Sequence, residues 1–252
     1  MKIAVCAKQI PDPAIEITYN GGIINRPDEQ VLDDTDRYGI EVALQLKEKF
    51  DAEVTVISMG SLGTEKGIQQ ALQMGPDGAL VLEDDSLSGA NSLMTANVLS
   101  ELSKKVEADI TIFGTESTDG YSGVIPQQVS RMLGVPCISY IKAVDIDESV
   151  TLTRQTSTGS EKVVMPANCV LSVTAGGVEP RYPNFKDIMA AKSKPIERIS
   201  IADINYDAQQ NLEFVDIKDV STTKQGEKII DEGEGFQIII DKLKELKAIW
   251  KH

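Results

Sequence analysis

The stretch with the most capacity for chemistry is GTESTDGYSGVIPQQ, a glycine-containing loop that runs from Gly114 to Gln128. It follows a strand-like segment and leads into a helix-like one. Glycines let a backbone approach a ligand closely, and N–H groups at a helix start, together with hydroxyl side chains, can hold a phosphate. Loops of this composition also join strands to helices without any ligand, so both interpretations stay open. Glu116 and Asp119 suit ribose hydroxyls or a helix cap better than a phosphate.

Two other patterns have the residue types of a site. The segment GSLGTEKG, Gly60–Gly67, has the spacing of a phosphate-binding loop but lacks the Lys-Ser/Thr ending, which favours a simple helix start. An acidic group consists of Asp28, Glu29, Asp33, Asp34 and Asp36. These carboxylates could bind a metal or exchange protons, but a solvated loop with a helix cap is the favoured interpretation.

The composition removes several chemistries. The only histidine is His252, which excludes histidine-based triads, histidine metal sites and a histidine general base. Cys6, Cys137 and Cys169 lie in apolar surroundings without C-x-x-C spacing, a pattern typical of reduced core cysteines in a cytoplasmic protein. We therefore expect no catalytic residue and no metal site.

Charge and hydropathy limit the partners. The chain of 252 residues carries 25 basic and 39 acidic residues, for a net charge of −14. Nucleic acids and anionic membranes are therefore unfavourable partners. No apolar run approaches the roughly 18 residues of a membrane span, which predicts no direct membrane insertion. Met1 leads straight into a strand-like segment, so we expect a cytoplasmic protein without a secretory signal.

Strand-like and helix-like segments alternate over residues 1–145. The strand-like segments are Lys2–Lys8, Glu53–Met59, Ala79–Leu82 and Ala108–Phe113. The helix-like segments between them end near Phe50, Gly75 and Val106, and a fourth ends near Leu133. This rhythm predicts an α/β fold with a mostly parallel, doubly wound sheet and flanking helices. Such sheets bind ligands beyond the carboxyl ends of their strands, here after Lys8, Met59 and Phe113.

The remaining segments are less regular. Glu16–Asn25 has the Asn-Gly turn of a small hairpin. Val150–Thr156 and Lys162–Val173 could pair and extend the sheet. We place one domain at residues 1–194 and a C-terminal arm at residues 195–252, with a polar linker at Ser221–Gly235. The arm ends in an amphipathic helix marked by Ile239, Leu243, Leu246 and Trp250, which either folds back or docks on a partner subunit.

The segment PRYPNFKDIMAAKSKP, Pro180–Pro195, places apolar side chains among cations in an otherwise acidic protein. An apolar group rimmed by cations is typical of a docking loop for a partner. The alternative is an internal helix with its polar face outward. The pattern alone leaves both interpretations open.

Several segments together resemble one family. KIAVCAKQIPD, VISMG with ALQMGPDGAL, ADITIFG with STDGYSG, and EPRYPNFKDIMAAKSKPIE are similar to the beta subunit of electron transfer flavoproteins. The similarity runs in order from residue 1 to about residue 205, and the EPRYP segment is its most specific part. The resemblance implies an adenine-nucleotide-binding α/β domain in an alpha–beta heterodimer. The alpha subunit holds most of the redox-active FAD site, and the beta subunit holds a structural AMP.

The resemblance also implies site residues by position. The nucleotide would lie against the ends of three strands and the glycine-containing loop, at Cys6, Asp33, Asp34, Thr35, Asp36, Met59, Asp119, Gly120, Tyr121, Ser122, Gly123, Val124, Ile125, Pro126, Gln127, Gln128, Val129 and Ser130. A recognition loop would dock acyl-CoA dehydrogenases or other redox partners through Arg181, Tyr182, Phe185, Ile188, Met189 and Lys192, with Phe185 as the apolar anchor. The C-terminal arm would wrap the alpha subunit.

The chain departs from the family pattern in the loop. Many AMP-binding members have an Asn-Gln-Thr-Gly run where this chain has TDGYSGVIP. Members that bifurcate electrons carry a second FAD and begin this loop with Asp-Gly and a hydroxyl two residues on, as Asp119 and Gly120 with Ser122 do. AMP and a second FAD both stay open, because the two ligands share an adenosine monophosphate half.

Two other functions are compatible with the fold. One is a stand-alone adenine-nucleotide-binding protein, either a stress-type sensor or a hydrolase. The missing triphosphate loop argues against it. The other is a protein-interaction module that has lost its nucleotide.

Overall fold

The computed structural model describes most of the chain and divides it into two compact units, residues 1–216 and residues 217–252. The described residues are 1–16, 18–20, 23–27, 29–60, 65–147, 149–206, 212, 228, 230–231 and 233–248. In the second unit they include helix α6, Gly235–Glu245. Ile239 and Leu243 lie on this helix as expected, whereas Trp250 and most of the expected linker lie outside the described residues.

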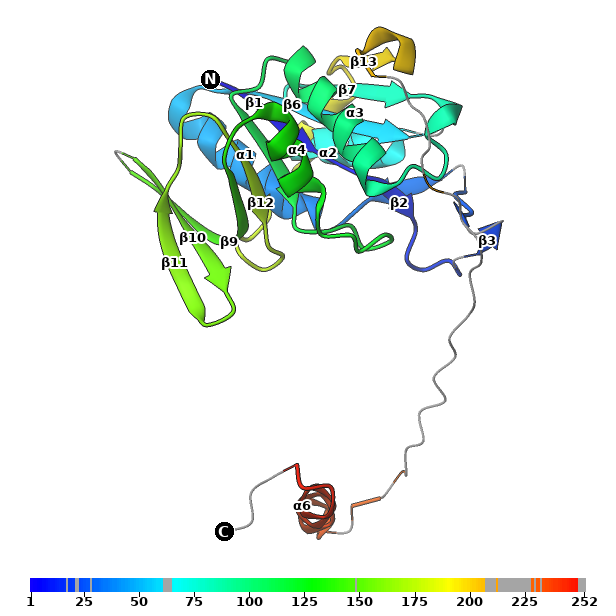
Figure 1. Cartoon of the computed structure of the whole chain (residues 1–252), viewed down its shortest axis with the longest axis vertical. Helices are drawn as coiled ribbons and strands as arrows, with labels where there is room; N and C mark the ends of the chain where they lie inside the picture. The colour runs from blue at the N-terminus through cyan, green and yellow to red at the C-terminus, as the bar shows by residue number, and fades with distance from the viewer. Residues whose placement is uncertain are drawn as a thin grey trace. The chain divides into compact units, whose positions relative to one another are not determined.

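The first unit is built on a nine-stranded sheet in its described part (Figure 1). The strand order is β11-β10-β9-β12-β8-β1-β6-β7-β13. The strands are β1 Lys2–Cys6, β6 Glu53–Gly60, β7 Gly78–Glu83, β8 Ile110–Gly114, β9 Cys137–Ile146, β10 Val150–Thr156, β11 Gly159–Val164, β12 Cys169–Val173 and β13 Ile196–Ile199. From β9 to β13 in this order every pairing is parallel, and β10 and β11 add an antiparallel edge. The predicted mostly parallel sheet is confirmed.

Helices cover both faces of the sheet. They are α1 Asp36–Phe50, α2 Lys66–Met74, α3 Ser92–Lys105, α4 Ile125–Leu133 and α5 Phe185–Ala191, with short 3₁₀ turns at Asp85–Leu87 and Ile201–Asp203. Successive strand residues point to opposite faces, so Ile3 and Val5 pack with α1 and α2 while Ala4 packs with α3 and α4. This two-sided burial explains why the central strands are apolar almost throughout.

Local signals place most element boundaries. Helix α2 ends at Gly75, whose φ of 141° suits glycine, and its N–H bonds the Leu72 carbonyl, as the predicted stop requires. Asn91 caps α3 through its side-chain oxygen, 3.0 Å from the Met94 nitrogen. The expected hairpin is present as β3 Tyr19–Asn20 paired with β4 Ile23–Ile24. A second small sheet pairs β2 Gln9–Pro11 with β5 Gln30–Leu32.

The segment Lys162–Val173 differs from its prediction as one strand. It pairs with β10 only as far as Val164, in β11. The chain then leaves the edge and returns at Cys169 as β12, a fully buried strand between β9 and β8. Pro166 lies in the connection, and because proline has no N–H it cannot continue a strand ladder.

Residues beyond 194 also contribute to the sheet. Strand β13 pairs in parallel with β7, with Ile196 opposite Ala79. The Pro195 carbonyl accepts the Ala79 N–H at 2.9 Å. The first residues of the expected arm are therefore the outermost strand of the parallel part.

Helix α2 lies so close to β5 that Gly67 has no room for a side chain. A Cβ atom there would lie 2.9 Å from the Leu32 nitrogen and 2.8 Å from the Gln9 Cγ. We expect Gly67→Ala to lower the free energy of unfolding by about 1–3 kcal/mol, because backbone must move apart. Gly60→Ala is the matched control, since a Cβ there meets nothing within 4 Å. Equal denaturant midpoints for the two variants would contradict this close approach.

Candidate functional site

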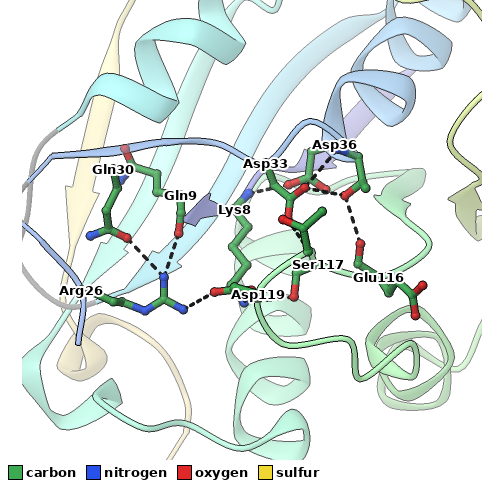
Figure 2. Close-up of polar contacts among 11 residues, drawn as sticks. Lys8, Gln9, Arg26, Gln30, Asp33, Asp36, Glu116, Ser117 and Asp119 are labelled. Atoms are coloured by element: carbon green, nitrogen blue, oxygen red, sulfur yellow. Dashed lines mark hydrogen bonds and ion pairs between the residues drawn. The ribbon is translucent and has the colours of Figure 1, made fainter. Parts of the chain in front are cut away.

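The candidate site lies where the carboxyl ends of β1, β6 and β8 meet. These parallel strands are neighbours, so the residues that follow Cys6, Gly60 and Gly114 emerge at one edge of the sheet. The start of α1 and the loop after β8 lie at the same edge (Figure 2). Cys6 is 7 % exposed, and Met59 is half-buried against the same core. The fold thus brings most of the predicted nucleotide residues to one edge.

Asp33 ties the start of α1 to the loop after β8. Its side chain is fully buried. One carboxylate oxygen accepts the Thr35 N–H at 3.0 Å, and the other accepts the Thr118 N–H at 2.7 Å. The hydroxyls of both threonines lie within 3.1 Å of the same carboxylate. Both carboxylate oxygens of Asp33 are therefore bound by donors within the protein.

Asp36 joins the ends of β1 and β8. Its Oδ2 accepts the Lys8 N–H at 2.7 Å, and Gly114 also donates its backbone N–H to this carboxyl. Burial raises the pKa of the Asp36 carboxyl to about 7; the two N–H donors oppose the shift and nearby Asp33 adds to it. Burial, followed by the charge of Asp36, also raises the pKa of the Cys6 thiol well above its ordinary value, so Cys6 is a neutral thiol.

Asp119 is held by two cations. Its side chain is 3 % exposed and lies 2.6 Å from the Lys8 Nζ and 2.5 Å from an Arg26 guanidinium nitrogen. Lys8 also reaches the Ser117 Oγ at 3.1 Å, and Arg26 donates to the Gln9 carbonyl at 3.1 Å (Figure 2). Burial alone would raise the pKa of the Asp119 carboxyl, but Lys8 and then Arg26 lower it below its ordinary value. The loop is thereby fixed to the segment that follows β1.

Beyond Asp119 the loop turns into α4 without a side-chain cap. Tyr121 and Gly123 have φ of 48° and 63°, and the N-cap residue Val124 has no side-chain oxygen that could accept an N–H bond from the helix. Gly120, Tyr121, Ser122, Val124 and Gln127 are exposed, Gly123, Ile125 and Gln128 are half-buried, and Pro126, Val129 and Ser130 are buried. The Gln128 Oε1 is buried without a hydrogen-bond partner in the described structure. Pro126 has no N–H, so the backbone donors of this uncapped first turn are those of Ile125 and Gln127, and the Gln128 side chain adds one unsatisfied acceptor within the described residues.

The start of α2, by contrast, is already closed. The Gln9 Oε1 accepts the Gly67 N–H at 2.9 Å and lies 3.4 Å from the Ile68 nitrogen. A side chain from outside the helix thus takes the place of a phosphate or a cap. The prediction that Gly60–Gly67 is a simple helix start stays consistent with this contact, although residues 61–64 lie outside the described residues.

The favoured interpretation of the acidic group, a solvated loop with a helix cap, is wrong about solvation for two of its members. Asp28 lies outside the described residues. Asp33 and Asp36 are 0 % and 8 % exposed and bond backbone N–H groups. Asp34 is exposed and pairs with Arg37 at 2.9 Å, and Glu29 is exposed. Within the ranges that the structure describes, no group of three or more metal-binding side chains could hold a metal ion.

Sequence reasoning missed Lys8, Gln9 and Arg26. The signal available was a Lys-Gln pair directly after the first strand, at the edge where such sheets bind ligands. Their partners lie far along the chain, with Arg26 and Asp119 separated by 93 positions. No periodicity links such positions, so only the fold could pair them.

The predicted docking residues gather around α5. Tyr182, Phe185 and Met189 are 91 %, 79 % and 50 % exposed. Lys192 is exposed and Ile188 is half-buried. The apolar side chains thus face outward, which contradicts the alternative of an internal helix with its polar face outward. Arg181 differs from the others because its guanidinium is bound to α1.

Comparison with known proteins agrees with this fold. Residues 21–204 match the family model described as electron transfer flavoprotein domain. Among curated relatives, the electron transfer flavoprotein subunit beta of Mycobacterium leprae is 34 % identical, over 98 % of this chain and 99 % of its own length. The corresponding proteins of Clostridium acetobutylicum and Bacillus subtilis are 31 % and 30 % identical, over 97 % and 83 % of this chain.

The fold and the family match define a protein of the electron transfer flavoprotein class. The relatives narrow this further, and the chain belongs to the family of electron transfer flavoprotein beta subunits. The resemblance seen in the sequence is confirmed. A search of the described helices finds none that is long and apolar enough to cross a membrane.

The buried Asp36 predicts a pH dependence of stability. In the unfolded chain its pKa is near 3.8, whereas in the folded protein it is about 7. The folded state therefore binds more protons between these values, and this carboxyl contributes less stability as the pH rises from about 4 to about 7. Asp36→Asn removes the titration. The unfolding free energy of the variant minus that of the wild type should rise by up to about 1.4 kcal/mol per pH unit in this window and level off above it.

Denaturant titrations between pH 4 and pH 9 measure this difference. Asp34→Asn, which alters an exposed carboxylate on the same loop, is the matched control. A difference that does not change with pH for Asp36→Asn would contradict the assignment.

Proposed function

We propose that the chain is the beta subunit of an alpha–beta electron carrier. With an FAD-bearing alpha subunit it accepts electrons from dehydrogenases, such as acyl-CoA dehydrogenases, and passes them on. The observation that carries this proposal is the similarity to beta subunits over nearly the whole chain. It also suits the side chains present, because the single histidine is terminal and the three cysteines have raised pKa values that keep them as thiols.

The proposed place of this subunit's own nucleotide is the edge formed by Asp33–Asp36 and the loop Asp119–Ser130. Its fit rests on the uncapped start of α4, where backbone N–H groups can bind a phosphate. It also rests on the buried Gln128 Oε1, an acceptor still without a donor within the described part of the chain. Gly120 and Gly123 leave room there for a ligand to approach the backbone.

The acidic residues have a supporting role in this proposal. Asp33 and Asp119 spend their oxygens on protein donors, so they order the loop and do not bind ribose. A bound flavin would supply the redox chemistry, since it can take up and release electrons one or two at a time. This chain's residues would bind and orient the nucleotide and keep the loop rigid.

The nucleotide is either AMP or a second, bifurcating FAD. Both carry the adenosine monophosphate half that the start of α4 would bind. Purification of the chain with its alpha subunit separates them, because AMP predicts about one flavin and one AMP per heterodimer, whereas bifurcation predicts two flavins and no AMP. Absorbance and nucleotide extraction measure the content. A colourless monomer with no affinity for an alpha subunit would contradict the electron-carrier proposal.

The loop makes a direct prediction. Gly123→Val places a side chain at the start of α4, where an added Cβ would lie 3.4 Å from the Glu116 carboxylate. Because this side chain would occupy the approach to the helix N–H groups, we expect at least about a tenfold loss of bound nucleotide. Gly134→Val is the matched control, because Gly134 has a similar φ of 70° at the other end of α4 with nothing within 4 Å. Both variants place a β-branched side chain at a positive φ of similar size, 63° and 70°. Equal nucleotide content in the two purified complexes would exclude the loop as the site.

The alternative, a stand-alone adenine-nucleotide sensor or hydrolase, predicts a different result. Such a protein would bind ATP more tightly than AMP. The start of α2, which could have held further phosphates, is closed by Gln9. Titration of the purified chain with ATP and AMP distinguishes the two functions.

A further inference from the structure

The segment around α5 is held at its two ends and exposed in its middle. At the beginning, Arg181 binds α1. At the end, Ala191 is fully buried in the core, and the Lys194 Nζ donates to the Leu72 carbonyl at the end of α2 at 2.9 Å. Between them, Tyr182 and Phe185 are 91 % and 79 % exposed. A loop anchored this way presents its aromatic side chains in one arrangement.

The anchor at Arg181 has four donor contacts. The Arg181 backbone N–H and Nε both reach the Glu41 Oε2, at 3.1 and 2.8 Å. One terminal nitrogen lies 3.0 Å from the Glu41 Oε1, and the other contacts Glu48 about two turns further along α1. The planar guanidinium matches Glu41 as a fork, which an ammonium cannot do.

Glu41 is suited to act as the fixed half of this contact. It is 4 % exposed, whereas Glu48 and Lys49, further along the same helix, are exposed. Gln45 donates to its Oε1 at 3.0 Å. Burial alone would raise the pKa of the Glu41 carboxyl, but Arg181 and Gln45 lower it below its ordinary value. A buried carboxylate with a matched cation has one preferred geometry, so the direction in which the loop leaves α1 is set.

The capped start of α5 keeps the loop in the direction that the Glu41–Arg181 pair sets. Asn184 accepts the Asp187 N–H at 3.0 Å, and Asp187 reaches back to the Asn184 N–H at 3.4 Å. This reciprocal cap fixes Asn184, the last of the three residues between Arg181 and Phe185, relative to the helix. Ordering side chains on binding costs affinity, and a loop already ordered avoids that cost.

We propose that Arg181 is a positioning residue that orients the docking loop through Glu41, and is not itself a contact for the partner. This inference rests on the proposed docking of a dehydrogenase by residues 182–192. It goes further by assigning the loop's orientation to one buried ion pair on α1. Breaking the pair should weaken encounter with the partner and leave the internal electron transfer steps unchanged.

The test uses the alpha–beta complex with an acyl-CoA dehydrogenase as electron donor. Arg181→Gln and Arg181→Lys should each raise the KM for the dehydrogenase about five- to tenfold with kcat within about twofold, because the loop must be ordered on binding. Amide hydrogen exchange at residues 182–189 of the complex should speed up about tenfold or more. Glu48→Gln, which removes only the exposed contact, is the matched control and should change KM less than twofold.

A loss of overall stability is separated from a loss of position by a double variant. Glu41→Gln with Arg181→Gln leaves no unpaired buried charge, so its denaturant midpoint should lie closer to that of the wild type than that of Arg181→Gln does. Its KM should stay raised, because an amide pair lacks the fork geometry. A KM that returns to the wild-type value in the double variant would overturn the positioning role.

Phe185→Ala distinguishes failure of this inference from failure of the docking proposal. If Phe185→Ala raises the KM and both Arg181 variants leave KM and exchange unchanged, docking stands and the positioning role is wrong. If Phe185→Ala leaves the KM unchanged, docking through this loop is wrong. In that case, faster amide exchange in the Arg181 variants would show only that the Glu41–Arg181 pair orders the segment. The proposed positioning role of Arg181 in docking would then be wrong as well.

Discussion

Three buried carboxylates at the carboxyl edge of the sheet hold the site together. Water cannot solvate Asp33, Asp36 or Asp119 there, so each must find donors within the protein. Asp33 takes N–H groups from two segments, and Asp119 takes two cations. Asp36 takes backbone N–H groups, and its burial raises its pKa to about 7 against the lowering effect of these donors and of the Lys8 charge. The hydrogen bonds and ion pairs of these three carboxylates hold the strand ends, the start of α1 and the loop after β8 together.

The starts of α2 and α4 at this edge differ in whether a side chain of the protein binds their N–H groups. Gln9 follows β1 directly, and its amide oxygen closes the start of α2. The start of α4 receives no such side chain, because Asp119 turns toward Lys8 and Arg26. A protein side chain thus binds the first N–H groups of α2, whereas the first turn of α4 has uncapped N–H groups for the proposed nucleotide. The proposed nucleotide position follows from this division, and it suits either AMP or FAD because both offer the same phosphate.

An electron carrier needs geometry more than reactive side chains. The first unit has two such features, the loop edge after β8 and the anchored apolar segment around α5. Both are fixed by buried acid–base contacts, Asp119 with its two cations and Glu41 with Arg181. Residues of this kind set where a cofactor and a partner lie, and the cofactor supplies the chemistry.

The sequence by itself determined what depends on neighbours along the chain. Alternating apolar segments predicted the parallel sheet, Gly75 predicted the end of α2, and the EPRYP segment pointed to the family. Local pattern failed where the answer depends on distant residues. It joined β11 to β12, treated Asp33 and Asp36 as solvated, and gave no sign that Arg181 is bound to α1. Only the tertiary structure decided these points, because Glu41 and Arg181 lie 140 positions apart and burial is created by packing. Periodicity reports a residue's own element, whereas an ion pair depends on which elements the fold brings together.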